Sequence, residues 1–355
     1  MANVIDYLKW RGDTLLEQVK FNEIDNLILA RVAYFPFDKI LSENDKKTVK
    51  ECYEVFKKNN DYSRILLKDD TELFEELSKS DRFKDLYITN YINKIDKVEE
   101  KQFSAITIEL PNNYIYVSYR GTDNTLVGWK EDFNLSFKEN VPAQIDAVEY
   151  LEKVEKTYNN AKIIIGGHSK GGNLAVYAAA FASDMTKKKI EAVYNNDGPG
   201  FCEKIIQSEE YKNIVDKVKS LVPQSSVVGR LLNHKEEYTI VKSTQVGIMQ
   251  HDLYSWQLIG SKFETLENVT NGSEIADKSI TNWLEQTTPE QREIFVDVLF
   301  DILNATNAKT LAEIKANLFQ NAKIILTSYK NIDEQSKEII NKTIRALLTP
   351  NFMRT

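Results

Sequence analysis

The sequence predicts an α/β fold, in which a mostly parallel sheet is flanked by helices and the chain carries helical extensions at both ends. Between residues 103 and 242, short apolar runs with strand-like alternation are separated by stretches with helical periodicity. Strand and helix patterns that alternate in this way are typical of βαβ units, whose strands run parallel. Outside this stretch, apolar residues recur mainly at helical spacing.

The region before residue 100 is predicted to be a helical scaffold that packs against the sheet. Apolar residues recur at helical spacing until Pro36 ends the first helical stretch. Ser42 or Asn44 is expected to cap a second helix, and the pair Asp69-Asp70 a third. The second and third helices are predicted at residues 45–56 and 71–77, and a further helix is predicted at residues 87–95.

The central region is expected to form the sheet and two of the helices that cover it. The turn residues Pro111-Asn112-Asn113 join two alternating runs and predict a hairpin. The predicted strands cover residues 103–110, 114–119, 162–165, 190–195, 215–222 and 238–242, and the predicted helices cover residues 142–158 and 171–181.

From about residue 262 the pattern changes to helices with polar starts. After a linker at 265–278, they are predicted at residues 281–286, 289–303, 311–328 and 334–348. We therefore expect two units, a sheet-containing domain at residues 1–260 and a helical C-terminal extension at residues 261–355. The apolar stripe of the C-terminal helices is expected to face a core, with a surface for a partner or a membrane as the alternative.

Composition and charge argue against several classes of function. Charged residues make up 28% and hydrophobic residues 42% of the 355 residues, an ordinary balance for a globular protein. The formal net charge of −7 argues against nucleic acid as a partner. No apolar run approaches the ~20 residues of a transmembrane segment, and the N-terminus lacks a signal-peptide pattern. Cys52, Cys202 and the three histidines suggest neither a disulfide framework nor a metal site, so a cytoplasmic location is expected.

One short stretch carries the strongest chemical signal. Gly167-His168-Ser169-Lys170-Gly171 fits the pattern G-x-S-x-G, which places a nucleophilic serine on a sharp turn between a strand and a helix. Glycine at both flanking positions lets the strand and the helix pack closely. The start of the helix adds a partial positive charge beside the serine. Ser169 is therefore the candidate nucleophile, and His168 is interpreted as structural.

A nucleophilic serine needs a base, and in this arrangement the base follows the serine in the chain. Only His234 and His251 lie downstream of Ser169. His251 stands in a mostly apolar stretch after the last predicted strand, where the base is expected. His234 stands in a charged stretch before that strand. His251 is therefore the candidate base, with His234 as the alternative.

The acid that orients the base is assigned from its position relative to a strand. Asp197 follows the predicted strand at 190–195, and a carboxylate at the C-terminal edge of a parallel sheet faces the active-site crevice. The next strand is followed by residues 224–226, which include no carboxylate. Asp252 adjoins His251, but the side chains of neighbouring residues diverge. Asp197 is therefore the candidate acid, and capping the turn that follows it is its alternative role.

Two backbone N–H groups are expected to form an oxyanion hole. One belongs to Lys170, the residue after the nucleophile. The other is assigned to Thr122, because Gly121 before it allows the loop after the strand at 114–119 to turn an N–H inward. The stretch at 123–141 follows this loop. It is expected to be either a lid over the site or an ordinary helix packed on the sheet.

These motifs together carry a family resemblance. The residues concerned are VSYRGT (117–122), Trp129, Asp132, GHSKGG (167–172), DYLKWRGD (6–13), NDGPGF (196–201) and QHDLYSW (250–256). Over about residues 100–255 the chain is similar to the class 3 lipases of the α/β-hydrolase group. Over most of its length it resembles an uncharacterised bacterial family of lipase-like proteins. The resemblance implies a serine esterase or lipase fold with Ser169 as nucleophile, His251 as base, and Thr122 with Lys170 at the oxyanion hole.

Two departures from the class 3 pattern bear on the site. Class 3 lipases carry their acid where this chain has residues 224–226, whereas Asp197 resembles the arrangement in pancreatic-type lipases. Lys170 replaces the usual apolar residue of Gly-His-Ser-Leu-Gly and is expected to place a cation near the pocket.

The function predicted from the sequence is a serine hydrolase of the lipase or carboxylesterase type. It would cleave a small-molecule or lipid acyl ester through an acyl-enzyme at Ser169, without a metal or an organic cofactor. A thioester or a peptide as the substrate fits the same residues. The alternative from a different class is a binding or scaffold protein that keeps the fold but has lost catalysis.

Overall fold

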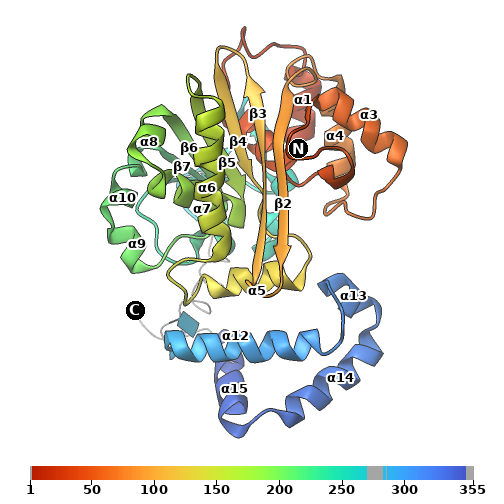
Figure 1. The fold of residues 1–355 in the computed structure, drawn as a ribbon, viewed down its shortest axis with the longest axis vertical. Helices are drawn as coiled ribbons and strands as arrows, with labels where there is room; N and C mark the ends of the chain where they lie inside the picture. Colours follow the sequence, from red (N-terminus) through yellow and green to blue (C-terminus); the bar gives the residue numbers. More distant parts are fainter. Residues whose placement is uncertain (1, 270–282, 285, 349–355) are drawn as a thin grey trace.

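The computed structural model describes residues 2–269, 283–284 and 286–348, and Figure 1 shows their arrangement. The helix expected at 281–286 and the linker expected at 265–278 lie largely outside the described residues. Within them, a central sheet carries helices on both faces. The α/β-hydrolase-like fold class expected from the sequence is therefore confirmed.

A nine-stranded sheet forms the centre of the described structure, in the order β1-β2-β3-β4-β5-β6-β7-β8-β11. Strands β4 to β8 run parallel, and the pairs at both edges are antiparallel. The strands are β1 (Lys46–Thr48), β2 (Tyr87–Asp96), β3 (Lys101–Leu110), β4 (Tyr114–Tyr119), β5 (Lys162–His168), β6 (Ile190–Asn196), β7 (Val218–Pro223), β8 (Tyr238–Val241) and β11 (Thr265–Leu266), with β9 (Leu258–Ile259) and β10 (Lys262–Phe263) as a separate pair. The C-terminal ends of the parallel strands meet at one edge of the sheet, where a site is expected in this class of fold.

Helices cover both faces of the sheet (Figure 1). They enclose two hydrophobic cores, one on each face. One face carries α1 (Val4–Arg11), α2 (Glu23–Val32), α3 (Val49–Asn59) and α4 (Asp69–Lys79), and the other carries α6 (Pro142–Thr157), α7 (Lys170–Phe181), α9 (Glu203–Gln207) and α10 (Glu209–Lys212). Successive side chains of a strand point to opposite faces. In β5, Ile164 accordingly joins the first core, whereas Ile163 and Ile165 join the second.

One predicted helix, at residues 87–95, is wrong, because these residues lie in strand β2 and pair antiparallel with β3. The register shifts between Thr89 and Ile92, and Asn90 has a left-handed φ of 52°. This irregularity moves the inward–outward alternation of the strand. The apolar residues at 88, 91, 92 and 95 consequently recur at a spacing that resembles one face of a helix.

Other boundaries differ from the prediction where a strand or a break intervenes. The helix expected at 45–56 is α3, which begins at Val49 because residues 46–48 pair with β2 and Thr48 caps the helix. The helix expected at 311–328 is two helices, α13 (Leu311–Ala316) and α14 (Leu318–Asn331), with a break at Asn317. Strand β11 pairs with β8 after residue 260, and the division into two units stays a prediction.

The C-terminal helices, from α12 (Pro289–Asn304) to α15 (Glu334–Leu348), lie next to α5 (Leu126–Asn134) beyond one end of the sheet (Figure 1). Their apolar side chains share a hydrophobic cluster with Leu126, Phe133 and Phe137. A backbone bridge joins Thr125 to Thr310, next to a hydrogen bond of 2.9 Å from the Leu126 N–H to the Lys309 carbonyl oxygen. The stretch expected to be a lid or a packed helix therefore contains a helix held between the sheet and the C-terminal helices.

None of the helices in the described part of the chain is both long enough and apolar enough to cross a membrane.

Candidate active site

Ser169 lies on a sharp turn between strand β5, which ends at His168, and helix α7, which begins at Lys170. Its backbone has φ 60° and ψ −137°, an unfavourable region for a residue with a side chain. The turn needs glycine at position 167, because a Cβ there would lie 2.2 Å from the backbone of Gly171. The close packing of strand and helix expected from the glycine pattern is therefore present, and Ser169 stays partly accessible.

His251 and Asp197 are in direct contact. The Nδ1 atom of His251 lies 2.6 Å from Oδ2 of Asp197. Asp197 follows the C-terminal end of β6 with a left-handed φ of 54°, a conformation that aspartate tolerates better than most residues. The Asp197 side chain is 1% exposed and that of His251 is 26% exposed. A buried carboxylate therefore holds one ring nitrogen of a histidine whose edge reaches solvent.

The second carboxylate oxygen of Asp197 is also satisfied. Its Oδ1 accepts hydrogen bonds from Ser226 Oγ at 2.5 Å and from the Gly229 N–H at 3.1 Å. Ser226 belongs to the segment after β7, residues 224–226, which contains no carboxylate. Strands β6 and β7 are parallel neighbours, so their ends lie side by side. The segment at 224–226 thus lacks a carboxylate of its own but contacts Asp197, which follows the neighbouring strand. No signal in the sequence pointed to this role of Ser226.

His251 is held by its neighbours as well as by Asp197. The neighbouring Gln250 is buried and accepts the Ser225 N–H at 2.7 Å, and its carbonyl oxygen accepts the indole N–H of Trp256 at 2.9 Å. The ring of His168 lies 4.6 Å from the ring of His251, and its Nε2 lies 2.9 Å from the His251 carbonyl oxygen. Since a carbonyl can only accept, His168 Nε2 carries the proton. Burial lowers the pKa of His168 well below its usual value, so this ring is neutral.

The loop assigned to the oxyanion hole lies against the elbow. A Cβ at Gly121 would lie 3.0 Å from Cβ of Ser169, so only glycine permits this approach. The Gly121 N–H donates to the hydroxyl of Tyr34 at 2.9 Å, and that hydroxyl donates to the His168 carbonyl oxygen at 2.9 Å. The next N–H, that of Thr122, makes no hydrogen bond within the described residues. Tyr34, which follows helix α2, had no sequence signal that linked it to this loop.

Lys170 contributes its backbone and its side chain in different directions. Its N–H belongs to the first turn of α7, where helix geometry leaves an N–H free. Its side chain is only 1% exposed, and its Nζ lies 2.7 Å from Oε2 of Glu131 on α5. The expectation that Lys170 places a cation near the pocket is therefore wrong, because the ammonium is buried between α7 and α5.

The alternative base, His234, lies in a different set of contacts. Its Nδ1 is 3.0 Å from Oε1 of Glu236, and the same carboxylate accepts hydrogen bonds from Ser220 Oγ, at 3.0 Å, and from Tyr211. Asp252 accepts the Tyr254 N–H at 3.0 Å and caps a short 3-10 turn. Of the residues considered for base and acid, the structure brings together His251 and Asp197.

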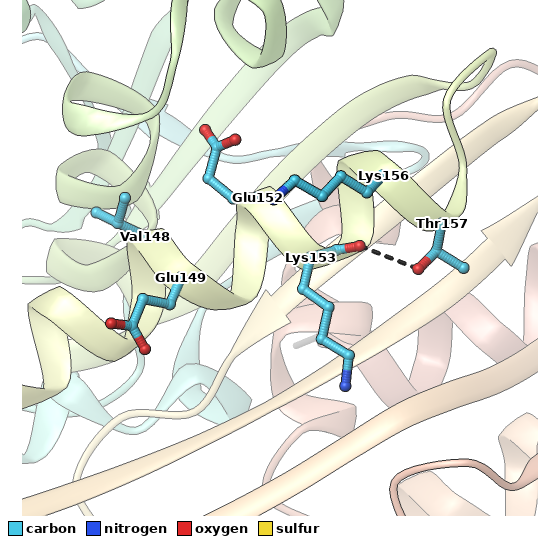
Figure 2. A pocket seen from close by; sticks show the side chains of 6 residues that line it. All are labelled: Val148, Glu149, Glu152, Lys153, Lys156 and Thr157. Atoms are coloured by element: carbon cyan, nitrogen blue, oxygen red, sulfur yellow. Dashed lines mark hydrogen bonds between the residues drawn. The ribbon is translucent and has the colours of Figure 1, made fainter.

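A hollow on the outer face of α6 is not part of this site. Figure 2 shows that its lining residues all come from that helix: Val148, Glu149, Glu152, Lys153, Lys156 and Thr157. Two of these side chains already have local partners, since Thr157 Oγ1 donates to the Lys153 carbonyl oxygen and Glu152 accepts the Ser183 N–H. We interpret this hollow as a solvated helix face.

A comparison with known protein families identifies the family of this chain. Residues 77–301, more than half of the chain, match the family model described as Mbeg1-like. The chain belongs to the Mbeg1-like family. The matched stretch includes Ser169, Asp197 and His251 as well as α5 and most of α12, so the family covers the sheet from β2 onward together with most of the first C-terminal helix. No curated protein matches the chain.

Solved lipase structures resemble this member of the family at low identity. Lipase II from Rhizopus niveus is 14% identical with a TM-score of 0.40, over 76% of this chain and 89% of that one. The mono- and diacylglycerol lipase from Aspergillus oryzae is 12% identical with a TM-score of 0.41, over 77% and 92%. A Rhizomucor miehei lipase in a propeptide complex is 14% identical with a TM-score of 0.40, over 77% and 76%.

Proposed function

We propose that the chain is a serine hydrolase of the lipase or carboxylesterase type, which cleaves a carboxylic ester through an acyl-enzyme at Ser169. One observation carries the proposal. His251, in a loop after the last parallel strand, meets the buried Asp197 at 2.6 Å, while Ser169 occupies a strained turn at the start of α7. Serine, histidine and aspartate follow the chain order Ser, acid, His that this type of fold uses.

Each residue has a distinct chemical role in the proposed reaction. The Ser169 oxygen attacks the ester carbonyl carbon while His251 takes the hydroxyl proton on Nε2. Asp197 accepts a hydrogen bond from Nδ1 of His251, which fixes the tautomer of the ring and stabilises its imidazolium form. The carbonyl oxygen becomes an oxyanion and accepts hydrogen bonds from the N–H groups of Thr122 and Lys170.

Collapse of the intermediate completes acylation, and deacylation by water then restores the enzyme. When the tetrahedral intermediate collapses, the bond to the leaving alcohol breaks and His251 returns its proton to the alkoxide. Water then attacks the acyl-enzyme, with His251 again as base, and the carboxylic acid leaves with Ser169 regenerated. This sequence needs only the groups of the chain, the ester and water.

Active-site labelling tests the proposal. A fluorophosphonate probe reacts with an activated serine, so we expect stoichiometric labelling of the folded protein and none of the Ser169→Ala variant. Ser63→Ala, which changes an exposed serine, serves as the matched control and is expected to label like the parent. Turnover of p-nitrophenyl butyrate should fall by at least ~10³-fold in His251→Ala, as for the loss of a triad member. Absence of labelling in the unaltered protein would refute the assignment.

The alternative is a hydrolase-fold binding or scaffold protein, and its main support is the missing carboxylate at 224–226. The contact of Asp197, from the neighbouring strand, with His251 supports the hydrolase proposal instead. If the folded protein neither reacts with the fluorophosphonate probe nor hydrolyses p-nitrophenyl esters, the chain is a binding or scaffold protein that keeps the hydrolase fold.

A further inference from the structure

The side chain of Lys170 carries a buried charge that contacts residues of β3 and α5. It is 1% exposed, and its ammonium group is surrounded by acceptors from two other elements. The Gln102 carbonyl oxygen and side-chain oxygen each lie 3.1 Å from Nζ, and Glu131 Oε2 lies at 2.7 Å. Three acceptors satisfy the three N–H bonds of the ammonium.

Both carboxylate oxygens of Glu131 also accept hydrogen bonds from backbone N–H groups. Its Oε2 also accepts the Gln102 N–H at 3.0 Å, and its Oε1 accepts the Ala143 N–H at 2.9 Å. The pair of Lys170 and Glu131 therefore fixes helix α5 to the sheet. This contact places the neighbouring residue, Asp132, at the side of the ammonium.

Asp132 connects this buried charge to the loop at Thr122. Its Oδ2 accepts a hydrogen bond from the hydroxyl of Thr122. Its Oδ1 lies 3.7 Å from the Lys170 ammonium and is buried without a hydrogen-bond donor among the described residues. An uncompensated carboxylate oxygen in such a place is costly, so the nearby positive charge stabilises the ionised form. One carboxylate thus touches both residues whose N–H groups are assigned to the oxyanion hole.

We propose that Lys170 is a positioning residue, whose buried ammonium acts through Asp132 to hold the Thr122 backbone at a fixed distance from the N–H of Lys170. The inference rests on the proposed function, because it assigns these two N–H groups to one oxyanion hole. An apolar side chain at position 170 has no charge with which to hold Asp132. We call this chain of contacts, from Lys170 through Asp132 to Thr122, the brace. It depends on a lysine at position 170.

The brace acts on the transition state more than on the ground state. Two donors stabilise a developing oxyanion only when both lie at hydrogen-bonding distance from it, and fixed donors need no rearrangement during the reaction. A looser Thr122 would weaken that stabilisation and leave the contacts of the bound ester largely unchanged. The expected signature is a lower kcat with little change in KM.

The test removes the ammonium without leaving Glu131 as a buried unpaired charge. The double variant Lys170→Met/Glu131→Gln is compared with Glu131→Gln, in which the ammonium keeps the two Gln102 oxygens and the nearby Asp132 carboxylate as partners. Lys170→Met alone is avoided, because it would leave Glu131 as a buried unpaired charge, which can prevent folding. Rates are expressed per active site titrated with fluorophosphonate, which removes the contribution of misfolded protein. We expect kcat to fall about 10-fold between the two, less than the roughly 10²–10³-fold loss for a whole oxyanion-hole donor.

The same comparison in an Asp132→Asn background tells a brace from general structural support. If Lys170 acts through Asp132, its removal has no further effect on kcat once Asp132 is neutral. An equal loss with and without Asp132, or an unchanged kcat per titrated site, would overturn the proposal while the serine hydrolase assignment stands.

Hydrogen exchange gives a readout that does not depend on catalysis. The amide groups of the loop at 120–124 should exchange faster in Lys170→Met/Glu131→Gln than in Glu131→Gln, whereas the strand amides of β4 should not change. Equal loop exchange in the two variants would overturn the brace. If the unaltered protein does not label, the proposed function fails, and the exchange result alone decides whether the brace exists.

Discussion

The Nδ1 atom of His251 lies 2.6 Å from Oδ2 of Asp197, although the two residues are 54 positions apart in the chain. Asp197 comes from the end of a parallel strand, and His251 comes from a short 3-10 turn beyond the last parallel strand. The contact forms because the strand end brings a buried carboxylate to the edge of the sheet where this turn passes. It is the structural basis of the proposed reaction.

Asp197→Asn is expected to abolish most of the activity and keep the fold. The amide can still occupy the site, but it favours the wrong tautomer of His251 and cannot stabilise the imidazolium. We expect kcat to fall by about 10³–10⁴-fold, as for the same change in other triads.

The control for this change is Asp252→Asn, which alters a carboxylate adjacent to His251 in the chain but bonded to the Tyr254 N–H. Asparagine caps a helix about as well as aspartate, so the change should alter stability by less than about 1 kcal/mol and leave kcat within a few-fold. Similar kcat values for the two variants would contradict the role of Asp197.

Tyr34→Phe is expected to lower both stability and activity. The hydroxyl joins the Gly121 N–H to the His168 carbonyl oxygen, and its removal leaves two buried polar groups without this partner. We expect the free energy of unfolding to fall by about 1–3 kcal/mol, and kcat to fall because the loop assigned to the oxyanion hole is less firmly held. Urea unfolding and steady-state kinetics measure the two effects.

Tyr150→Phe is the matched control for the loss of a buried tyrosine hydroxyl. Its hydroxyl contacts Thr107 at 2.8 Å and the Asn90 carbonyl oxygen at 3.0 Å, on the β2–β3 side of the sheet. It should destabilise the protein by a similar amount and leave kcat per titrated site unchanged. Equal losses of kcat in both variants would show that Tyr34 acts only through stability.

Asp132 is expected to make stability depend on pH. Burial raises its pKa to about 6, with Glu131 adding to the rise and Lys170 and the Thr122 hydroxyl opposing it. The negative charge of Asp132 also contributes to the raised pKa of the buried Tyr34, whose main cause is burial. Because the folded state binds this proton more tightly than the unfolded state, the group's contribution to stability is present in acid and is lost as pH rises through about 6.

Urea unfolding at several pH values measures this effect. The unfolding free energy of the parent minus that of Asp132→Asn should fall by roughly 2 kcal/mol between pH 4 and pH 7 and stay constant above it. A difference that is flat over the whole range would contradict the raised pKa of Asp132.

The sequence alone indicated the central parallel strands, the helices around them and the elbow at Ser169. These features are local, because the period of apolar residues and the glycines of a tight turn are readable within a few residues. Strand β2 was missed because the irregularity at Asn90 gives it a helix-like spacing. The side chain of Lys170 was misplaced because its direction depends on Glu131, which belongs to another element.

The sequence by itself determined which residue types are available to the site: one serine on an elbow, two downstream histidines and a carboxylate after a strand. The tertiary structure decided which of them meet. It placed His251, and not His234, beside Asp197, and it brought Tyr34 and Ser226 to the same region from the helix side and from the next strand. The reason is physical, since contacts between distant segments depend on how strands and helices pack and leave no periodic signal in the chain.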